Sequence, residues 1–147
     1  MEDYFHFYTE ISINRLQHRR METTGQSLRK ILIIDDNEAI AKVVMIYLKN
    51  EYDTVWMENP LESLDWMRKN PLPDLILSDI RMPEMRGDEF LLKIKSDENY
   101  RHIPVVMLSG EDSTSERVRL LQDGAADYIV KPFNPVELRT RIKRILV

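Results

Sequence analysis

Residues 31–38 read ILIIDDNE, an apolar run that ends on two adjacent carboxylates, Asp35 and Asp36. Four apolar residues, three of them β-branched, favour a short strand that is buried on both faces. Two neighbouring negative charges, in contrast, need water or a cation. The stretch therefore predicts a buried strand whose carboxyl end carries a polar site.

The same arrangement recurs along the rest of the chain, where apolar runs alternate with helical patterns. The expected strands are residues 31–35, 53–57, 73–79, 104–109 and 127–132. The expected helices are residues 37–50, a segment capped by Asn59, residues 87–96, residues 115–124 and residues 134–147. Five βα units with apolar strands predict an α/β fold with a doubly wound, five-stranded parallel sheet and helices on both of its faces.

Helical periodicity also predicts which helix faces are buried. For residues 37–50 the expected apolar face is Ile40, Val43, Val44, Tyr47 and Leu48. For the helix capped by Asn59 it is Leu61, Leu64, Trp66 and Met67.

The composition bounds the possible classes of protein. The chain has 147 residues, enough for one domain, and its 43% hydrophobic and 31% charged residues are typical of a soluble globular protein. The net charge of −4 argues against direct nucleic-acid binding. The absence of cysteine excludes disulfides and thiolate metal sites. No apolar run approaches the length of a membrane span, so we expect a cytoplasmic protein.

The first 29 residues differ from the remainder, with an aromatic-rich start (MEDYFHFY), a basic stretch (INRLQHRR) and a polar lead (TTGQS). We expect residues 1–29 to form an N-terminal extension, flexible or a short helix. Residues 30–147 then form the domain.

Polar residues follow four of the five expected strands. In an open parallel sheet the ligand site lies outside the carboxyl ends of the strands, where the strand order reverses. If the order is 2-1-3-4-5, the first and third strands are neighbours at that point. The polar residues expected at this edge of the sheet are Asp35, Asp36, Asp79, Ser109 and Lys131.

Three carboxylates at one edge repel each other unless a hard cation neutralises them. Oxygen ligands without histidine or cysteine favour Mg²⁺, which in turn attracts phosphate oxygens. Asp79, the central carboxylate, is then the natural nucleophile for an acyl phosphate. Lys131 supplies a fixed positive charge, and the Ser109 hydroxyl can bond a phosphoryl oxygen.

Four stretches, LIIDDNE, LILSDIRMPEMRGDEF, VVMLSGED and GAADYIVKPF, together resemble the receiver domain of bacterial two-component response regulators. The resemblance spans residues 30–147 and implies the flavodoxin-like strand order 2-1-3-4-5. It implies a signalling phosphoacceptor, not an enzyme, that a sensor histidine kinase or phosphotransfer protein phosphorylates. The phosphorylated residue would be Asp79.

The resemblance also implies individual roles at the site. Asp36 would bind Mg²⁺ directly, Asp35 through water, and Arg81 through its main-chain carbonyl. Lys131 would pair with the phosphate. Ser109 and Tyr128 would move when the phosphoryl group arrives, and the peptide bond before Pro132 would be cis.

The stretch ERVRLLQDGAADYIVKPFNPVELRTRIK resembles the subfamily of response regulators that dimerises and carries a winged-helix output domain. Arg117 with Glu137, and Asp127 with Arg141, would form ion pairs between subunits of a phosphorylation-favoured homodimer. Ala126 departs from the aspartate usual at its position, so part of that network is missing.

Three alternatives remain at this point. A flavodoxin-like cofactor binder would need a glycine- or serine-rich phosphate loop, where this chain has DDNE. A Mg²⁺-dependent aspartyl-phosphate phosphatase or transferase usually places its nucleophile and its acid two residues apart on the first strand, where this chain has Asn37. The third alternative is an interaction module with an inactive site, and the complete set of polar residues argues against it.

Overall fold

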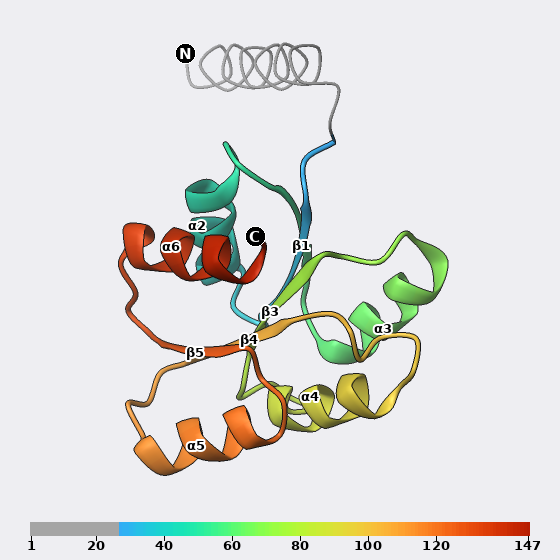
Figure 1. Cartoon of the computed structure of the whole chain (residues 1–147), viewed down its shortest axis with the longest axis vertical. Coiled ribbons are helices and arrows are strands. Elements are labelled where there is room, and N and C mark those ends of the chain that lie inside the picture. The colour runs from blue at the N-terminus through green and yellow to red at the C-terminus, as the bar shows by residue number, and fades with distance from the viewer. Residues whose placement is uncertain (1–26) are drawn as a thin grey trace.

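The computed structural model describes residues 27–147 and contains a five-stranded parallel sheet between two layers of helices (Figure 1). The strands are β1 (Lys30–Ile34), β2 (Asp53–Met57), β3 (Leu75–Asp79), β4 (Val105–Ser109) and β5 (Asp127–Val130). Their order in the sheet is β2-β1-β3-β4-β5, which confirms the predicted topology. The extension expected for residues 1–29 lies almost wholly outside the described residues.

Five helices connect the strands or follow them. They are α2 (Glu38–Leu48), α3 (Pro60–Lys69), α4 (Gly87–Ser96), α5 (Thr114–Gln122) and α6 (Pro135–Ile145). Asparagine caps three of them: Asn37, Asn59 and Asn134 each accept hydrogen bonds from main-chain N–H groups of the first turn. Such caps satisfy donors that have no partner inside the helix. Among the described residues, no helix has the length and apolar character that a membrane crossing requires.

Each face of the sheet packs against its own set of helices. Helices α2 and α6 cover one face, and α3, α4 and α5 cover the other (Figure 1). Residues of β1 alternate between the two cores, with Ile31 and Ile33 on the α2–α6 side and Leu32 and Ile34 on the other. All four are at most 1% exposed, so the run ILII is buried on both faces as its composition predicts.

The predicted helix faces need two corrections. Val43 is 42% exposed, and Ala41 takes its place beside Val44 and Leu48 in the core. Leu61 is 46% exposed at the start of α3. Residues at positions 41, 44 and 48 follow the three- and four-residue spacing of one helix face, and Val43 lies about 100° around the helix from Val44.

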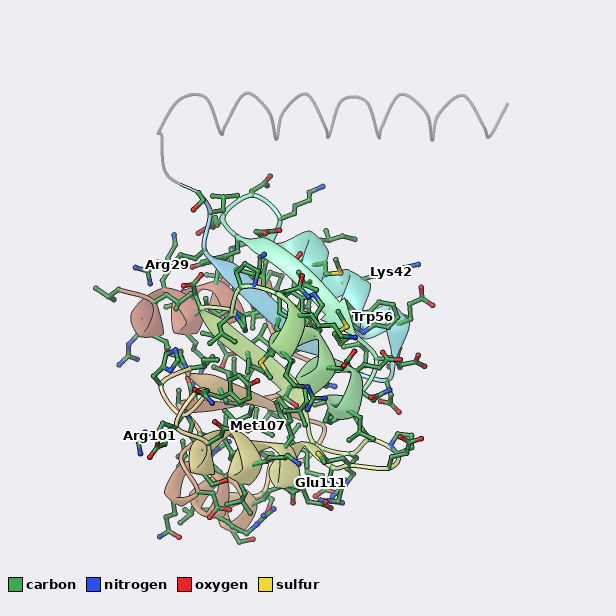
Figure 2. The ribbon with its side chains drawn as sticks, turned by 90° about the vertical axis from the view of Figure 1, so that its right-hand side faces the viewer. Arg29, Lys42, Trp56, Arg101, Met107 and Glu111 are labelled. Carbon is green, nitrogen blue, oxygen red and sulfur yellow. The ribbon has the colours of Figure 1, made fainter. Side chains whose placement is uncertain are left out.

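Charged side chains point outward from the helices, whereas apolar side chains of the strands lie between the sheet and the helices. Lys42 extends from α2 at the periphery, whereas Met107 of β4 lies inside, between the sheet and its helices (Figure 2). No described side-chain nitrogen or oxygen that is fully buried lacks a hydrogen-bond partner.

The parallel register decides where the polar strand ends meet. Ile34 of β1 pairs with Ser78 of β3, so Asp35 and Asp79, the residues that follow, lie side by side. Ser109 pairs with Val130, which places Lys131 next to the end of β4. Short βα turns therefore gather the predicted polar residues at one edge of the sheet.

Candidate functional site

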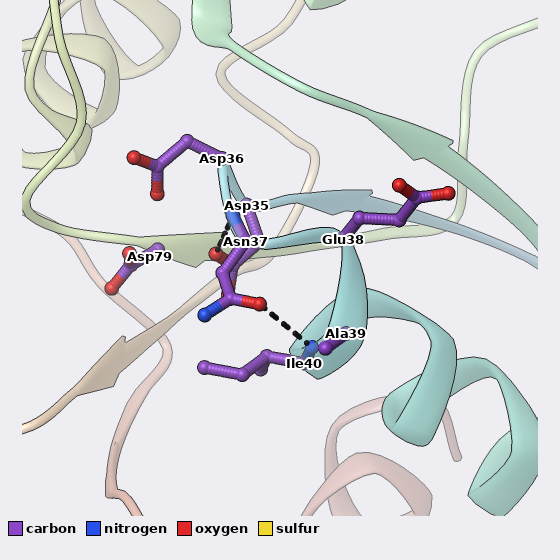
Figure 3. A pocket seen from close by; sticks show the side chains of 7 residues that line it. All are labelled: Asp35, Asp36, Asn37, Glu38, Ala39, Ile40 and Asp79. Atoms are coloured by element: carbon purple, nitrogen blue, oxygen red, sulfur yellow. Dashed lines mark hydrogen bonds between the residues drawn. The ribbon is translucent and has the colours of Figure 1, made fainter.

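Three carboxylates meet at the carboxyl ends of β1 and β3. Asp35, Asp36 and Asp79 each offer an oxygen atom, and these atoms lie within 4.8 Å of one another. Asp36 and Asp79 extend to the same side of the turn that begins α2, where Asp35–Ile40 line a pocket together with Asp79 (Figure 3). The burial of the three differs: Asp35 is buried, Asp79 is half-buried and Asp36 is exposed.

Asp35 is the most constrained of the three carboxylates. It is 1% exposed, and its Oδ1 accepts a hydrogen bond from the main-chain N–H of Asn37 at 2.9 Å. Burial raises the pKa of the Asp35 carboxyl above its ordinary value, although the Asn37 N–H and Lys131 act in the opposite direction. A carboxylate held in so little water gains most from a nearby cation.

Lys131 is the only described lysine whose ammonium group contacts this cluster. Its Nζ lies 3.1 Å from Asp35 Oδ2 and 3.3 Å from Asp79 Oδ1, and the side chain is 15% exposed. The peptide bond between Lys131 and Pro132 is cis, as the resemblance implied. The structure thus brings the predicted lysine to the predicted phosphoacceptor.

The loop after β3 fixes the position of Asp79. Its Oδ1 accepts a hydrogen bond from the main-chain N–H of Ile80 at 2.9 Å. Gly87 N–H donates to the Ile80 carbonyl at 2.7 Å, and a Cβ atom at Gly87 would lie 1.9 Å from the Asp79 carbonyl oxygen. Only glycine allows this close approach of the α4 start to the end of β3.

Ser109 reaches the same edge of the sheet, but its hydroxyl is bonded elsewhere. The hydroxyl donates to Glu116 Oε1 at 3.0 Å and accepts from the main-chain N–H of Glu111 at 3.1 Å. Tyr128, 3% exposed, places its hydroxyl 2.6 Å from the Glu111 carbonyl and 2.8 Å from the same Glu116 oxygen. The structure therefore joins the two predicted mobile residues through Glu116, a residue the sequence did not single out.

Two further contacts at the site escaped the sequence analysis. The indole N–H of Trp56 donates to the Asp35 carbonyl at 2.9 Å, so a side chain of β2 supports the turn that carries the carboxylates. The guanidinium of Arg81, in the loop after β3, pairs with Glu111, in the loop after β4. Trp56 lies in a predicted strand. Its side chain reaches Asp35 because of the register between β1 and β2, and that register cannot be read from the sequence.

The residues expected at a subunit interface pair within the single chain. Arg141 contacts Asp127 at 2.9 Å and Glu137 at 3.1 Å, and Arg117 contacts Asp112 at 3.0 Å. The predicted pair of Asp127 and Arg141 thus forms inside one subunit. Within the single chain, Arg117 pairs with Asp112, and Glu137, its predicted partner in a second subunit, pairs with Arg141.

Comparisons with known proteins agree with this geometry. Residues 31–143 match the family described as the response regulator receiver domain. The phosphate regulon transcriptional regulatory protein PhoB of Escherichia coli is 39% identical over 119 residues, which cover 80% of this chain and 52% of PhoB. Histidine kinase P4 of Formosa agariphila is 43% identical over 123 residues, which cover 84% of this chain and 9% of that protein. The chain therefore spans between about a tenth and a half of these relatives.

Solved structures share the fold. The chemotaxis protein CheY4 of Vibrio cholerae superposes with a TM-score of 0.75 at 31% identity, over 82% of this chain and all of that chain. A CheY-like receiver domain protein of Methanospirillum hungatei superposes with a TM-score of 0.73 at 35% identity, over 82% of this chain and 94% of that one. With its strand order, its acidic cluster and these relatives, the chain belongs to the response regulator receiver domain family of two-component signalling.

Proposed function

We propose that Asp79 accepts a phosphoryl group from the phosphohistidine of a sensor histidine kinase or phosphotransfer protein. The observation that carries the proposal is the convergence of three carboxylates within 4.8 Å beside Lys131. The family includes receiver domains and relatives with histidine kinase names, which supports a donor of this kind. Of these three carboxylates, only Asp79 combines partial exposure with contact to the ammonium group of Lys131.

The same cluster is suited to Mg²⁺. Asp36 is exposed and Asp79 half-buried, so both present oxygens to an incoming hydrated ion. Asp35 is already bonded to Asn37 and Lys131, which suits a role through bound water. The main-chain carbonyl of Arg81 completes the proposed ligands.

In the proposed transfer an Asp79 carboxylate oxygen attacks phosphorus, the bond from phosphorus to the histidine nitrogen breaks, and an acyl phosphate forms. Bound Mg²⁺ would neutralise charge on the carboxylates and on the phosphoryl oxygens. Lys131, already 3.3 Å from Asp79, would pair with the added negative charge. The same ammonium group also contacts buried Asp35 at 3.1 Å, which helps to hold the lysine in place.

We further propose that the chain is a phosphoacceptor and not an enzyme that turns over phosphate esters. Asn37, two residues after Asp35, has its Oδ1 engaged by the Ile40 N–H as the cap of α2. An amide that caps a helix cannot act as the general acid of a phosphatase. We place this function in the cytoplasm, where a histidine kinase obtains its phosphoryl group from ATP.

The test is incubation of the protein with acetyl phosphate and Mg²⁺, followed by intact-mass spectrometry. We expect a gain of one phosphoryl group, lost in Asp79→Asn and when Mg²⁺ is removed with EDTA. Asp74→Asn is the matched control, because exposed Asp74 lies just before β3, at the opposite end of that strand from Asp79. Phosphorylation that persists in Asp79→Asn would overturn the assignment, and sustained hydrolysis of unrelated phosphate esters would favour the phosphatase.

We also propose that phosphorylation favours a homodimer through α5, β5 and α6. Helices α5 and α6 flank edge strand β5 on opposite sides (Figure 1). Helices α5 and α6 carry three exposed apolar side chains, Val118, Leu121 and Val136, which are 46%, 43% and 62% exposed. The same elements carry the charged residues Arg117, Asp127, Glu137 and Arg141, and interfaces combine apolar contacts with a polar rim. The charge of −4 supports a partner other than nucleic acid.

Sedimentation velocity with and without beryllofluoride and Mg²⁺ tests this dimer. We expect the sedimentation coefficient to rise on activation in the wild type and to stay at the monomer value in Val136→Glu. Leu92→Glu is the control, since Leu92 is 51% exposed on α4, away from this edge. Identical sedimentation of the free and activated wild type would exclude the dimer.

A further inference from the structure

Glu116 accepts hydrogen bonds from two hydroxyls with one oxygen. Its Oε1 lies 3.0 Å from Ser109 Oγ and 2.8 Å from Tyr128 Oη. Ser109 ends β4, Tyr128 belongs to β5, and Glu116 stands in the first turn of α5. One carboxylate therefore ties together the strand end, the neighbouring strand and the helix that follows the site.

The local sequence gives Glu116 a different expected partner. Ser113 and Glu116 form the S-x-x-E pattern of a capping box, in which the glutamate reaches back to the N–H of the capping residue. Ser113 does cap α5, since its Oγ accepts from the Glu116 N–H at 3.3 Å. The Glu116 carboxylate, however, turns to the hydroxyls of Ser109 and Tyr128. The side chain is thus engaged in a tertiary contact beyond its helix.

The single hydrogen of the Ser109 hydroxyl limits which acceptors that residue can bond at one time. A hydroxyl carries one donor hydrogen, and that of Ser109 is directed at Glu116, while its lone pair accepts from the Glu111 N–H. The same hydrogen cannot simultaneously bond a phosphoryl oxygen on Asp79. The single hydrogen of the Tyr128 hydroxyl is shared between two acceptors, Glu116 Oε1 and the Glu111 carbonyl. The guanidinium of Arg117 lies 5.3 Å from the Tyr128 ring centroid.

We propose that Glu116 is a positioning residue that competes with the phosphoryl group for the Ser109 hydroxyl and so lowers the affinity of the site for that group. The proposal rests on the function proposed above, in which Ser109 bonds the phosphoryl group on Asp79. A hydrogen bond to a carboxylate is stronger than one to a neutral acceptor, so ionised Glu116 is an effective competitor. Loss of this bond releases Ser109 before any phosphoryl group arrives.

The test measures the affinity for beryllofluoride, a mimic of the phosphoryl group, in the presence of Mg²⁺. We expect Glu116→Ala to bind it about threefold to tenfold more tightly than the wild type, the equivalent of one hydrogen bond. Glu116→Gln has nearly the same shape and keeps an acceptor without the charge, so its affinity should be intermediate. Glu98→Ala, which removes an exposed glutamate from the loop between α4 and β4, should match the wild type.

The substitution Glu116→Ala is also tested in Ser109→Ala protein. This comparison distinguishes release of the Ser109 hydroxyl from a simple loss of negative charge near the site. In Ser109→Ala, the further change Glu116→Ala should leave the beryllofluoride affinity unchanged. An unaltered affinity in both Glu116 variants, or a gain that persists without the Ser109 hydroxyl, would overturn the proposal. Glu116→Gln also keeps the test decisive if Glu116→Ala is poorly folded.

The same measurements separate this inference from the proposed function. A wild type that neither gains a phosphoryl group from acetyl phosphate nor binds beryllofluoride through Asp79 contradicts the proposed function, and the role of Glu116 falls with it. A wild type that does both, with unchanged Glu116 variants, contradicts the role of Glu116 alone. Without any ligand, the amide signal of Glu111 should shift in the NMR spectrum of Glu116→Ala, because that amide donates to Ser109.

Discussion

At the scale of single residues, the site depends on groups that do no chemistry themselves. Asp35 and Asp79 are placed by main-chain contacts, and the residues that make those contacts possible lie outside the acidic motif. Trp56 supports the turn after β1, and Gly87 lets the start of α4 approach the end of β3. Substitutions of Trp56 and Gly87 should therefore change Mg²⁺ affinity and stability although neither residue belongs to the acidic cluster.

Trp56→Phe should weaken Mg²⁺ binding by a factor of about 2 to 10, the effect of one hydrogen bond. Phenylalanine keeps most of the apolar contact but removes the N–H that bonds the Asp35 carbonyl at 2.9 Å. Isothermal titration with Mg²⁺ measures the change. Trp66→Phe, on α3, is the control and should bind Mg²⁺ as the wild type does. An unchanged affinity in Trp56→Phe would show that the turn does not need this support.

Gly87→Ala should lower the free energy of unfolding by at least about 2 kcal/mol, because overpacking against main chain cannot be relieved by a side-chain rotation. The new Cβ would lie 1.9 Å from the Asp79 carbonyl oxygen. Urea unfolding monitored by circular dichroism measures the loss. Gly110→Ala is the matched control, since a Cβ there meets no atom within 4 Å. Equal stability of the two variants would contradict this account of Gly87.

At the scale of elements, helix α4 is tied to α5 through the carboxylate of Asp88. This residue lies in the first turn of α4 and contacts Arg86 at 3.0 Å and Arg119 of α5 at 3.3 Å. Burial opposes ionisation, but Arg86, the main-chain N–H of Asp88 and Arg119 together outweigh it and lower the pKa of Asp88 below its ordinary value. An anion at a helix N-terminus is favourable for the same electrostatic reason.

This lowered pKa predicts a pH-dependent stability. The unfolded chain binds a proton at Asp88 more readily than the folded chain, so the contribution is present above the ordinary pKa and is lost as the pH falls through the folded value. Asp88→Asn should therefore be less stable than the wild type by about 0.5–1 kcal/mol at pH 7. The difference should shrink below about pH 4. Urea unfolding at several pH values measures it, and a difference that stays constant down to pH 3 would refute the electrostatic explanation.

The elements also show where sequence patterns were sufficient and where they were not. All five strands and all five helices of the described residues lie where the apolar runs and the asparagine caps predict them. The predicted buried faces of the helices were less accurate: Val43 and Leu61 were expected in the core, but both are exposed. A helix can carry more apolar residues than its buried face holds, so composition alone could not fix its rotation.

At the scale of the whole molecule, binding at the acidic cluster should stabilise the fold, because the unfolded chain cannot gather three carboxylates. Mg²⁺ at ten times its dissociation constant should add about 1.4 kcal/mol, or a few degrees in Tm for a chain of this size. Differential scanning fluorimetry measures the shift. Asp36→Asn should abolish most of it, whereas Asp53→Asn, at the start of β2, should not. An equal shift in Asp36→Asn would place the ion elsewhere.

Local patterns in the chain were enough to predict the alternation of strands and helices, the class of fold and the identity of the polar residues at the strand ends. Apolar runs must be buried, and parallel strands must end on the same edge of the sheet, so Asp35, Asp79 and Lys131 could be assigned to one site before any coordinates were known. These properties depend on hydrophobic periodicity and on the order of the elements along the chain, and both can be read directly from the amino-acid sequence.

The groups that support that site, and the partners of the Ser109 hydroxyl, follow from three-dimensional packing and could not be predicted from the chain alone. Trp56 meets Asp35 through the register of β2 on β1, and Glu116 leaves its expected capping partner for hydroxyls on two different strands. Register and side-chain direction follow from the packing of the whole core, in which each contact depends on the others. For that reason the acidic cluster could be predicted from short motifs, whereas the hydrogen bonds that position its neighbours could not.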